Sequence, residues 1–222
     1  MSAEAYNAAK KREIAALRAL GWLPWSAADC GSLQFAADCK QWQQQANAHV
    51  GAGLAVDGAC GPETWASLRS MYAPREWLRA IPVGLRNLEL TYGKVREVPP
   101  VRVDIFAGSG RRIAVHPLLA AEIPRLLEVA AERSGYVPRD VQSYNVRRKR
   151  GGGASSGVRD WSTHSWAIAL DIDPPLNPWG NKPSAPLMQH PAFLATFRAA
   201  GWSVGADWRN PDTMHVQAVR GY

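Results

Sequence analysis

The strongest constraint on the fold comes from two short stretches that each carry one histidine and one aspartate. His164 precedes Asp171 by seven positions, and Asp212 precedes His215 by three. Two imidazoles and one carboxylate make a zinc site that leaves one coordination position free, and the second carboxylate then remains as a general base. A chain that uses all four residues must fold so that the two stretches meet at one point.

The spacing within each stretch adds a local condition. Residues an odd number of positions apart on a straight strand face opposite sides, so His164 has to lie in a loop or at a bulge to share a metal with Asp171. Three extended residues span ~10 Å, so a turn must separate Asp212 from His215. Taken alone, each pair is explained more simply as a surface pair or a turn.

The first third of the chain has the spacing of helices. Apolar residues recur at helical intervals over residues 3–20 and 31–46, and Gly61-Pro62 has the sequence of a helix start. Prolines then interrupt the pattern. We therefore expect an all-helical domain over residues 1–73, followed by a linker and entry segment over residues 74–100.

The pattern of apolar residues changes after residue 100. Alternating apolar residues predict strands, and two longer amphipathic stretches predict helices. In chain order we expect strands at 101–105 and 113–115, a helix at 116–134, strands at 141–144 and 166–172, a helix at 191–200, and a strand through His215. Strands mixed with helices predict an α+β domain over residues 101–222, with the chemistry at strand ends.

The charge of the chain favours an anionic partner. The net charge is +7 and the pI is about 9.6. A basic run over residues 147–150 opens a glycine-rich loop that we expect at 148–160, and such a run is compatible with a nucleic-acid patch. No recognised nucleic-acid motif accompanies it, so nucleic acid is not an expected partner.

Other compositional features bear on where the protein acts. No apolar run approaches the ~20 residues that span a bilayer, and residues 1–12 lack the apolar core of a secretory signal. We therefore expect no membrane insertion and synthesis in the cytoplasm. Cys30, Cys39 and Cys60 are odd in number and lack metal-site spacing, so we expect buried apolar thiols instead of a disulfide framework.

A turn motif in the first domain resembles the peptidoglycan-binding three-helix module. Residues 57–64 are Asp-Gly-Ala-Cys-Gly-Pro-Glu-Thr, and the signature of the module is Asp-Gly-x-x-Gly-Pro-x-Thr. The resemblance covers about residues 10–72 and implies that Asp57, Gly61 and Thr64 bind the cell wall. The alternative is a tight turn into a helix, in a helical domain without a binding role.

Three ordered motifs in residues 101–219 resemble those of the VanY-like D,D-carboxypeptidases and the phage L-alanyl-D-glutamate endolysins. That family carries Ser-x-His-x-x-Gly-x-Ala-x-Asp and, later, Trp followed by Asp-x-x-His. The endolysin branch adds Ser-Tyr-Asn-x-Arg upstream. The matching residues here are Ser143, Tyr144, Asn145 and Arg147, then Ser162, His164, Ala169 and Asp171, then Trp208, Asp212 and His215.

The resemblance implies a role for each residue of the candidate site. His164, Asp171 and His215 are expected to bind Zn²⁺, which polarises the scissile carbonyl and lowers the pKa of its water to ~7. Asp212 is expected to take the proton of the attacking water and pass it to the leaving amine. Arg147 is expected to stabilise the oxyanion or to hold a substrate carboxylate.

The resemblance implies roles for three more residues, and the sequence departs from the family pattern at two positions. Ser162 and Asn145 are expected to contact substrate, and Asp173 or Ser162 to orient a metal ligand. Ala167 replaces the glycine of the first motif, and Gln217 replaces a glutamate after the last ligand. We expect these replacements to alter packing or specificity without loss of the metal.

Together these expectations describe a peptidoglycan hydrolase of the endolysin type that cuts the L-Ala–D-Glu bond of the stem peptide. The resemblance implies a monomer that is made in the host cytoplasm, needs a holin for release, and acts on the cell wall or in the periplasm. One alternative is a D,D-carboxypeptidase or endopeptidase acting on D-Ala bonds. Another is a non-catalytic wall-binding or virion structural protein.

Overall fold

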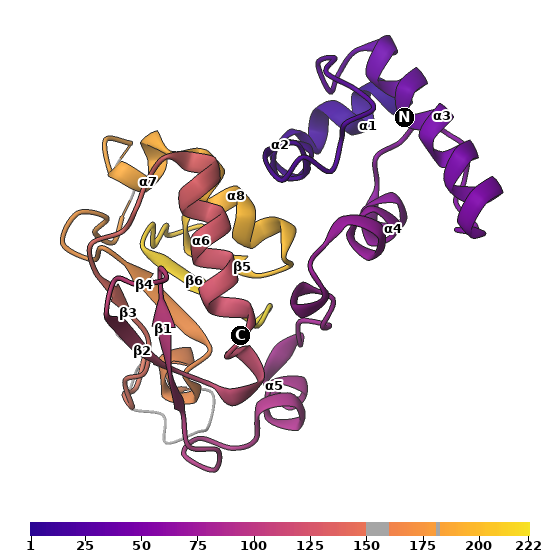
Figure 1. The fold of residues 1–222 in the computed structure, drawn as a ribbon. Helices are drawn as coiled ribbons and strands as arrows, with labels where there is room; N and C mark the ends of the chain where they lie inside the picture. The colour runs from indigo at the N-terminus through magenta and orange to yellow at the C-terminus, as the bar shows by residue number, and fades with distance from the viewer. Residues whose placement is uncertain (150–159, 181–182) are drawn as a thin grey trace. The chain divides into compact units, whose positions relative to one another are not determined.

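A computed structural model describes residues 1–149, 160–180 and 183–222 of the protein (Figure 1). The chain folds into two compact units, Met1–Leu78 and Arg79–Tyr222. None of the described helices is long and apolar enough to cross a membrane.

The stretch 74–100, expected as a linker and entry segment, contains regular structure. A 3₁₀ helix, η1 (Arg75–Trp77), belongs to the first unit, and an α-helix, α5 (Gly84–Tyr92), belongs to the second. Trp77 and Tyr92 are each 1% exposed. Each of the two elements therefore contributes a buried aromatic side chain to its own unit.

Four α-helices account for most of the first unit: α1 (Ala3–Ala9), α2 (Lys11–Ala19), α3 (Leu33–Val50) and α4 (Pro62–Tyr72). Ser32 caps α3 because its hydroxyl accepts a hydrogen bond from the Phe35 N–H at 3.1 Å. Gly51 ends the same helix in a left-handed conformation. Pro62 stands in the first turn of α4, as its sequence position predicts.

The single helix expected over residues 3–20 is instead two helices that meet at Lys10 (φ −98°, ψ 22°). Asn7 is fully buried; its side chain donates to the Gly58 carbonyl at 2.9 Å and accepts from the Cys60 N–H at 2.8 Å. These bonds fix α1 to the loop before α4. Long-range anchoring of this kind overrides the local periodicity, and the chain bends between α1 and α2.

The core of the first unit follows the helical spacing of α3. Phe35, Cys39 and Trp42 are all buried, as their i, i+4 and i+7 positions predict. Cys30 and Cys60 are also buried, and all three cysteines are free thiols. The prediction that the cysteines are buried apolar residues is confirmed.

The second unit contains a β-hairpin, a four-stranded sheet and the helices around them. β1 (Val101–Ile105) pairs antiparallel with β2 (Arg111–Val115), in agreement with the alternation of the sequence. The sheet has the strand order β3-β4-β6-β5, and all its pairs are antiparallel. Its strands are β3 (Val141–Gln142), β4 (Ala169–Ile172), β5 (Ser203–Val204) and β6 (His215–Gln217).

Two helices of the second unit, α6 and α8, contact each other and lie side by side in Figure 1. Ile123 and Leu126 on α6, and Phe193 and Phe197 on α8, are completely buried. The described helices of this unit after α5 are η2 (Pro117–Leu119), α6 (Glu122–Ser134), η4 (Thr163–Trp166), α7 (Pro186–Gln189), α8 (Pro191–Ala199) and η5 (Gly205–Asp207). The unit therefore has the expected α+β architecture, with β4 and β6 at the centre of its sheet.

Candidate metal centre

Pairing of β4 with β6 brings the two histidine–aspartate stretches together. Asp171 on β4 is the Cα partner of His215 on β6. His164 lies outside the strand, in η4, and Ala167 turns the chain in a left-handed conformation (φ 56°, ψ 36°) before β4 begins. The prediction that His164 lies outside the strand is confirmed. The strand expected over residues 166–172 starts only at Ala169 because of this turn.

Each histidine ring has one nitrogen that points away from the other histidine. A hydrogen-bond acceptor lies beside each of these outward nitrogens. His164 Nδ1 contacts the Ser143 carbonyl oxygen, and His215 Nε2 lies 3.0 Å from Gln217 Oε1. The Gln217 amide nitrogen donates to the Val219 carbonyl at 3.2 Å, which turns the amide oxygen toward His215. Because these oxygens can only accept, each outward nitrogen carries the ring proton. In the neutral form of each ring, the lone pair then lies on His164 Nε2 and on His215 Nδ1.

These two nitrogens converge on the Asp171 carboxylate. His164 Nε2 is 3.3 Å from His215 Nδ1 and 3.2 Å from Asp171 Oδ1, and His215 Nδ1 is 2.9 Å from the same oxygen. Ligand atoms at ~2.0–2.1 Å from a tetrahedral zinc lie about 3.3 Å apart, so the three separations fit one ion. Two lone pairs and a carboxylate oxygen at these distances repel one another unless a cation lies between them.

The electrostatics of Asp171 agree with a ligand role. Burial opposes its ionisation, but positive charge at the His164 and His215 nitrogens outweighs burial and holds the pKa of this carboxyl below its usual range. A metal ion bound between the three groups would supply such a charge in place of the imidazole protons. A metal ligand has to be deprotonated. Among the residues that the structure describes, these three form the one cluster of histidine and acidic side chains close enough to share an ion.

A tight turn joins Asp212 to His215. The His215 N–H donates to the Asp212 carbonyl at 3.0 Å, which is the turn that the spacing required. Gly205 lies against this turn, since the Asp212 N–H donates to the Gly205 carbonyl at 2.9 Å. A Cβ at Gly205 would lie 2.3 Å from the Asp212 carbonyl oxygen. Only glycine permits this approach, so Gly205 helps to place Asp212.

A cavity of about 600 Å³ contains most of the predicted site. Asp171 and His215 line it, and so do Asp212, Arg147 and Ser162. A candidate base, a cation and two of the three candidate metal ligands thus face one space. This combination can bind a carbonyl group, hold a negative charge and accept a proton from water.

The stretch 143–147 supports His164 through its backbone. The Asn145 N–H donates to the His164 carbonyl at 3.2 Å, and the Ser165 hydroxyl accepts from the Arg147 N–H and donates to the Arg147 carbonyl, both at 3.1 Å. The Asn145 side chain is exposed and is not among the described residues that line the cavity. The Asn145 backbone therefore holds η4 in place, and a contact between its side chain and substrate stays a prediction.

Asp173 does not orient a metal ligand. Its buried carboxylate accepts hydrogen bonds from the Arg139 N–H at 2.9 Å, from the Asp140 N–H at 2.6 Å and from the Tyr136 hydroxyl. These bonds tie the end of β4 to the segment before β3. The groups beside the outward ring nitrogens of the two histidines are instead Gln217 and the Ser143 carbonyl.

The basic, glycine-rich loop expected over residues 148–160 lies mostly outside the described residues. At its described ends, Arg148 stacks over Trp161 at 4.1 Å from the ring centroid, and Lys149 over Tyr222 at 3.7 Å. Lys149 and Tyr222 both line the cavity. Burial lowers the pKa of Lys149, against the opposing charge of Asp160. The basic run thus adds a cation to the cavity wall.

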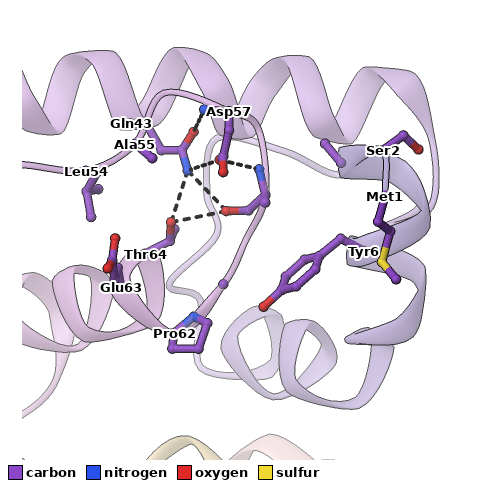
Figure 2. A pocket seen from close by; sticks show the side chains of 13 residues that line it. Met1, Ser2, Tyr6, Gln43, Leu54, Ala55, Asp57, Pro62, Glu63 and Thr64 are labelled. Carbon is purple, nitrogen blue, oxygen red and sulfur yellow. Dashed lines mark hydrogen bonds between the residues drawn. The ribbon is translucent and has the colours of Figure 1, made fainter.

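A second candidate site lies in the first unit, where Gln43 on α3 organises the turn motif (Figure 2). Its amide nitrogen is 3.1 Å from both Asp57 Oδ1 and Thr64 Oγ1, and its amide oxygen accepts from the Gly58 N–H at 2.9 Å. Gly58 has a φ of +80°, and a Cβ there would lie 2.6 Å from the Ala36 carbonyl oxygen. Asp57 and Thr64 therefore keep this loop in shape.

The same loop borders a pocket of about 440 Å³. Asp57, Gly61 and Thr64 all line it, together with Tyr6 and Glu63, as Figure 2 shows for the labelled side chains. Asp57 and Glu63 are exposed, so two carboxylates face the opening, whereas Thr64 is buried against Gln43. The residues expected to bind the wall thus share one pocket.

Comparison with known proteins gives one match. Residues 156–218 match the family model for D-alanyl-D-alanine carboxypeptidase. The matched segment contains His164, Asp171, Asp212 and His215, and it supports a peptidase that acts on cell-wall peptides. No curated protein and no solved structure matches the chain significantly.

Sequence reasoning did not assign a role to three residues of the site. Gln217 lies two positions after His215 on β6, and the strand period of two could have placed both on one face. Gly205 acts through a backbone approach that only the folded structure shows. Trp179, which lines the cavity, has no pattern around it that distinguishes it from a core tryptophan.

Proposed function

We propose that the protein is a zinc-dependent peptidoglycan hydrolase that cuts the L-Ala–D-Glu bond of the stem peptide. The observation that carries this proposal is the convergence of two histidine lone pairs and the Asp171 carboxylate within 3.3 Å of one another. They lie in a segment that matches a cell-wall carboxypeptidase model. Asp212 and Arg147 in the same cavity supply the remaining groups that hydrolysis needs.

Each group has a chemical task. Zinc, when bound by His164, Asp171 and His215, supplies Lewis acidity and makes water a better nucleophile at neutral pH. The Asp212 carboxylate takes a proton from the attacking water and delivers it to the amine that leaves. The Arg147 guanidinium holds the oxygen on which negative charge develops, or a carboxylate of the substrate.

The choice of bond rests on the stretch Ser143–Arg147, whose sequence resembles that of the L-alanyl-D-glutamate endolysins. Its backbone supports His164, and its last residue lines the cavity. The family match favours a second candidate, cleavage of a D-Ala bond, because the matched model is that of a D-alanyl-D-alanine carboxypeptidase.

Mass spectrometry of digested peptidoglycan separates the two. Cleavage at L-Ala–D-Glu exposes a new D-Glu amino group and leaves L-Ala on the glycan. Cleavage at a D-Ala bond instead releases D-Ala or separates cross-linked peptides. Release of D-Ala without any new D-Glu terminus would refute the bond that we propose.

We further propose that the first unit binds the wall through the pocket beside the turn motif. The supporting observation is that Asp57, Gly61 and Thr64 share one pocket, next to Tyr6. Substituting Asp57→Ala should reduce co-sedimentation of the full chain with purified sacculi, while cleavage of a soluble muropeptide stays unchanged. Asp38→Ala, which removes a half-buried carboxylate on α3 outside the pocket lining, is the matched control. Equal sedimentation of both variants would remove the anchoring role.

A further inference from the structure

Two tryptophans in the wall of the metal-site cavity take no part in the proposed chemistry. Trp179 and Trp208 line the same cavity as Asp171, His215 and Asp212. Trp179 is 65% exposed, and Trp208 is 37% exposed. An indole ring is normally among the most buried of side chains, and its exposure beside a reactive centre indicates a surface for a ligand.

The backbone of Trp179 and the ring of Trp208 are held next to the turn that carries Asp212 and His215. Trp179 forms a β-bridge with Asp212, and the Gly180 N–H donates to the Pro211 carbonyl at 2.8 Å. The Trp208 indole N–H donates to Ser203 Oγ at 3.2 Å, and its ring centroid is 5.3 Å from that of His215. The two segments are therefore fixed to the turn that carries the base and the third ligand.

The chemistry of the proposed substrate decides what such a surface can bind. The stem peptide offers small methyl groups, carboxylates and an amine, and none of these matches the flat apolar face of an indole. The C–H face of a pyranose ring does match it, and wall peptides are joined to an amino sugar through a lactyl group. Arg147 and Lys149, in the same cavity, suit the carboxylates of the peptide.

We propose that Trp179, assisted by Trp208, forms a stacking platform for the N-acetylated amino sugar that carries the stem peptide. This inference rests on the proposed function and names its substrate as a glycan-linked peptide. The enzyme then acts on peptide still attached to the glycan, and sugar binding positions the scissile bond over the metal ligands.

The distance along the stem peptide from the sugar to each candidate bond bears on which bond is cut. Only L-Ala separates the lactyl group from the L-Ala–D-Glu bond. The terminal D-Ala–D-Ala bond lies three residues further, which adds roughly 10 Å in an extended peptide. A sugar platform in the same cavity as His215 therefore fits the first bond and not the last.

The test compares two soluble substrates with the same cleavable bond, N-acetylmuramyl-L-Ala-D-Glu and the lactyl-L-Ala-D-Glu that lacks the sugar. The zinc-loaded full chain should prefer the sugar-bearing substrate, and Trp179→Ala should abolish the preference. Loss of about 50 Å² of buried apolar contact corresponds to roughly five- to tenfold in kcat/KM. Trp179→Phe should restore part of the preference, and Leu176→Ala, an exposed residue outside the described cavity lining, should behave as the unaltered protein.

Binding of the methyl glycoside of N-acetylmuramic acid, followed by NMR, provides a readout that needs no cleavage. Sugar-induced shifts of the Trp179 indole signal, together with line broadening of the sugar signals that Trp179→Ala abolishes, would support the platform even if neither substrate is cut, in which case only the bond assignment fails. Equal cleavage of both substrates by the unaltered protein and by Trp179→Ala, with no sugar-induced shifts, would overturn the platform and leave the bond assignment intact.

Discussion

Gln217 offers a sharp test of how the fold prepares the metal site. Its amide oxygen lies 3.0 Å from both His215 Nε2 and the Thr163 hydroxyl, and its amide nitrogen is fixed by the Val219 carbonyl. Gln217 is only 3% exposed, so water cannot easily replace a lost acceptor. Replacing Gln217 with leucine leaves the imidazole N–H and a buried hydroxyl without this acceptor.

The magnitude follows from these contacts. Loss of an acceptor that orients a metal-binding histidine typically costs 10–100-fold in metal affinity, which is about 1.4–2.7 kcal/mol. Gln217→Leu should therefore weaken zinc binding by about that factor. Gln217→Glu keeps an acceptor on His215 Nε2 and should bind zinc far more tightly than the leucine variant.

Competition with a chromophoric chelator measures these affinities on the apoproteins. Thr196→Val is the matched control, because Thr196 is also a fully buried polar residue, whose hydroxyl donates to the Ala192 carbonyl on α8, away from the site. It should lower the melting temperature without changing zinc affinity. Zinc affinity of Gln217→Leu equal to that of the unaltered protein would refute the orienting role.

Three further predictions concern the remaining residues of the site. Asp212→Asn should retain zinc and lose about 10²–10⁴-fold in turnover, and full activity of the metallated variant would remove Asp212 from the mechanism. Arg147→Lys should reduce activity strongly because lysine lacks the planar fork, whereas Arg148→Lys, outside the cavity lining, should not; similar activity of the two variants would argue against a role for Arg147. Ala167→Gly should raise the free energy of unfolding by about 1 kcal/mol, since Ala167 has a φ of 56° and left-handed backbone costs alanine roughly that much; an unchanged denaturation midpoint would contradict this.

The backbone geometry around His164, Asp171, Asp212 and His215 could be predicted because its constraints are local. The odd spacing of His164 and Asp171 required His164 to leave the strand, and it lies in η4. The spacing of Asp212 and His215 required a turn, and the His215 N–H closes one. The spacing did not indicate that the backbone at Ala167 is left-handed. This is the position at which the first motif carries glycine.

Other features depend on contacts between distant residues and have no local signal. The break between α1 and α2 arises because Asn7 bonds to the backbone around Gly58 and Cys60. The support that Asn145 gives to η4 could not be foreseen either, because it comes from a backbone bond to His164. Such features require the tertiary structure, since nothing within a few residues of each position distinguishes them.

His164, Asp171 and His215 are proposed to hold one zinc ion. Calorimetric titration of Zn²⁺ into chelator-stripped protein tests this proposal most directly. One tight site per chain in the unaltered protein, lost in His215→Ala, is the predicted result. An unaltered protein that binds no zinc, or a His215→Ala variant that binds it equally tightly, would contradict the claim.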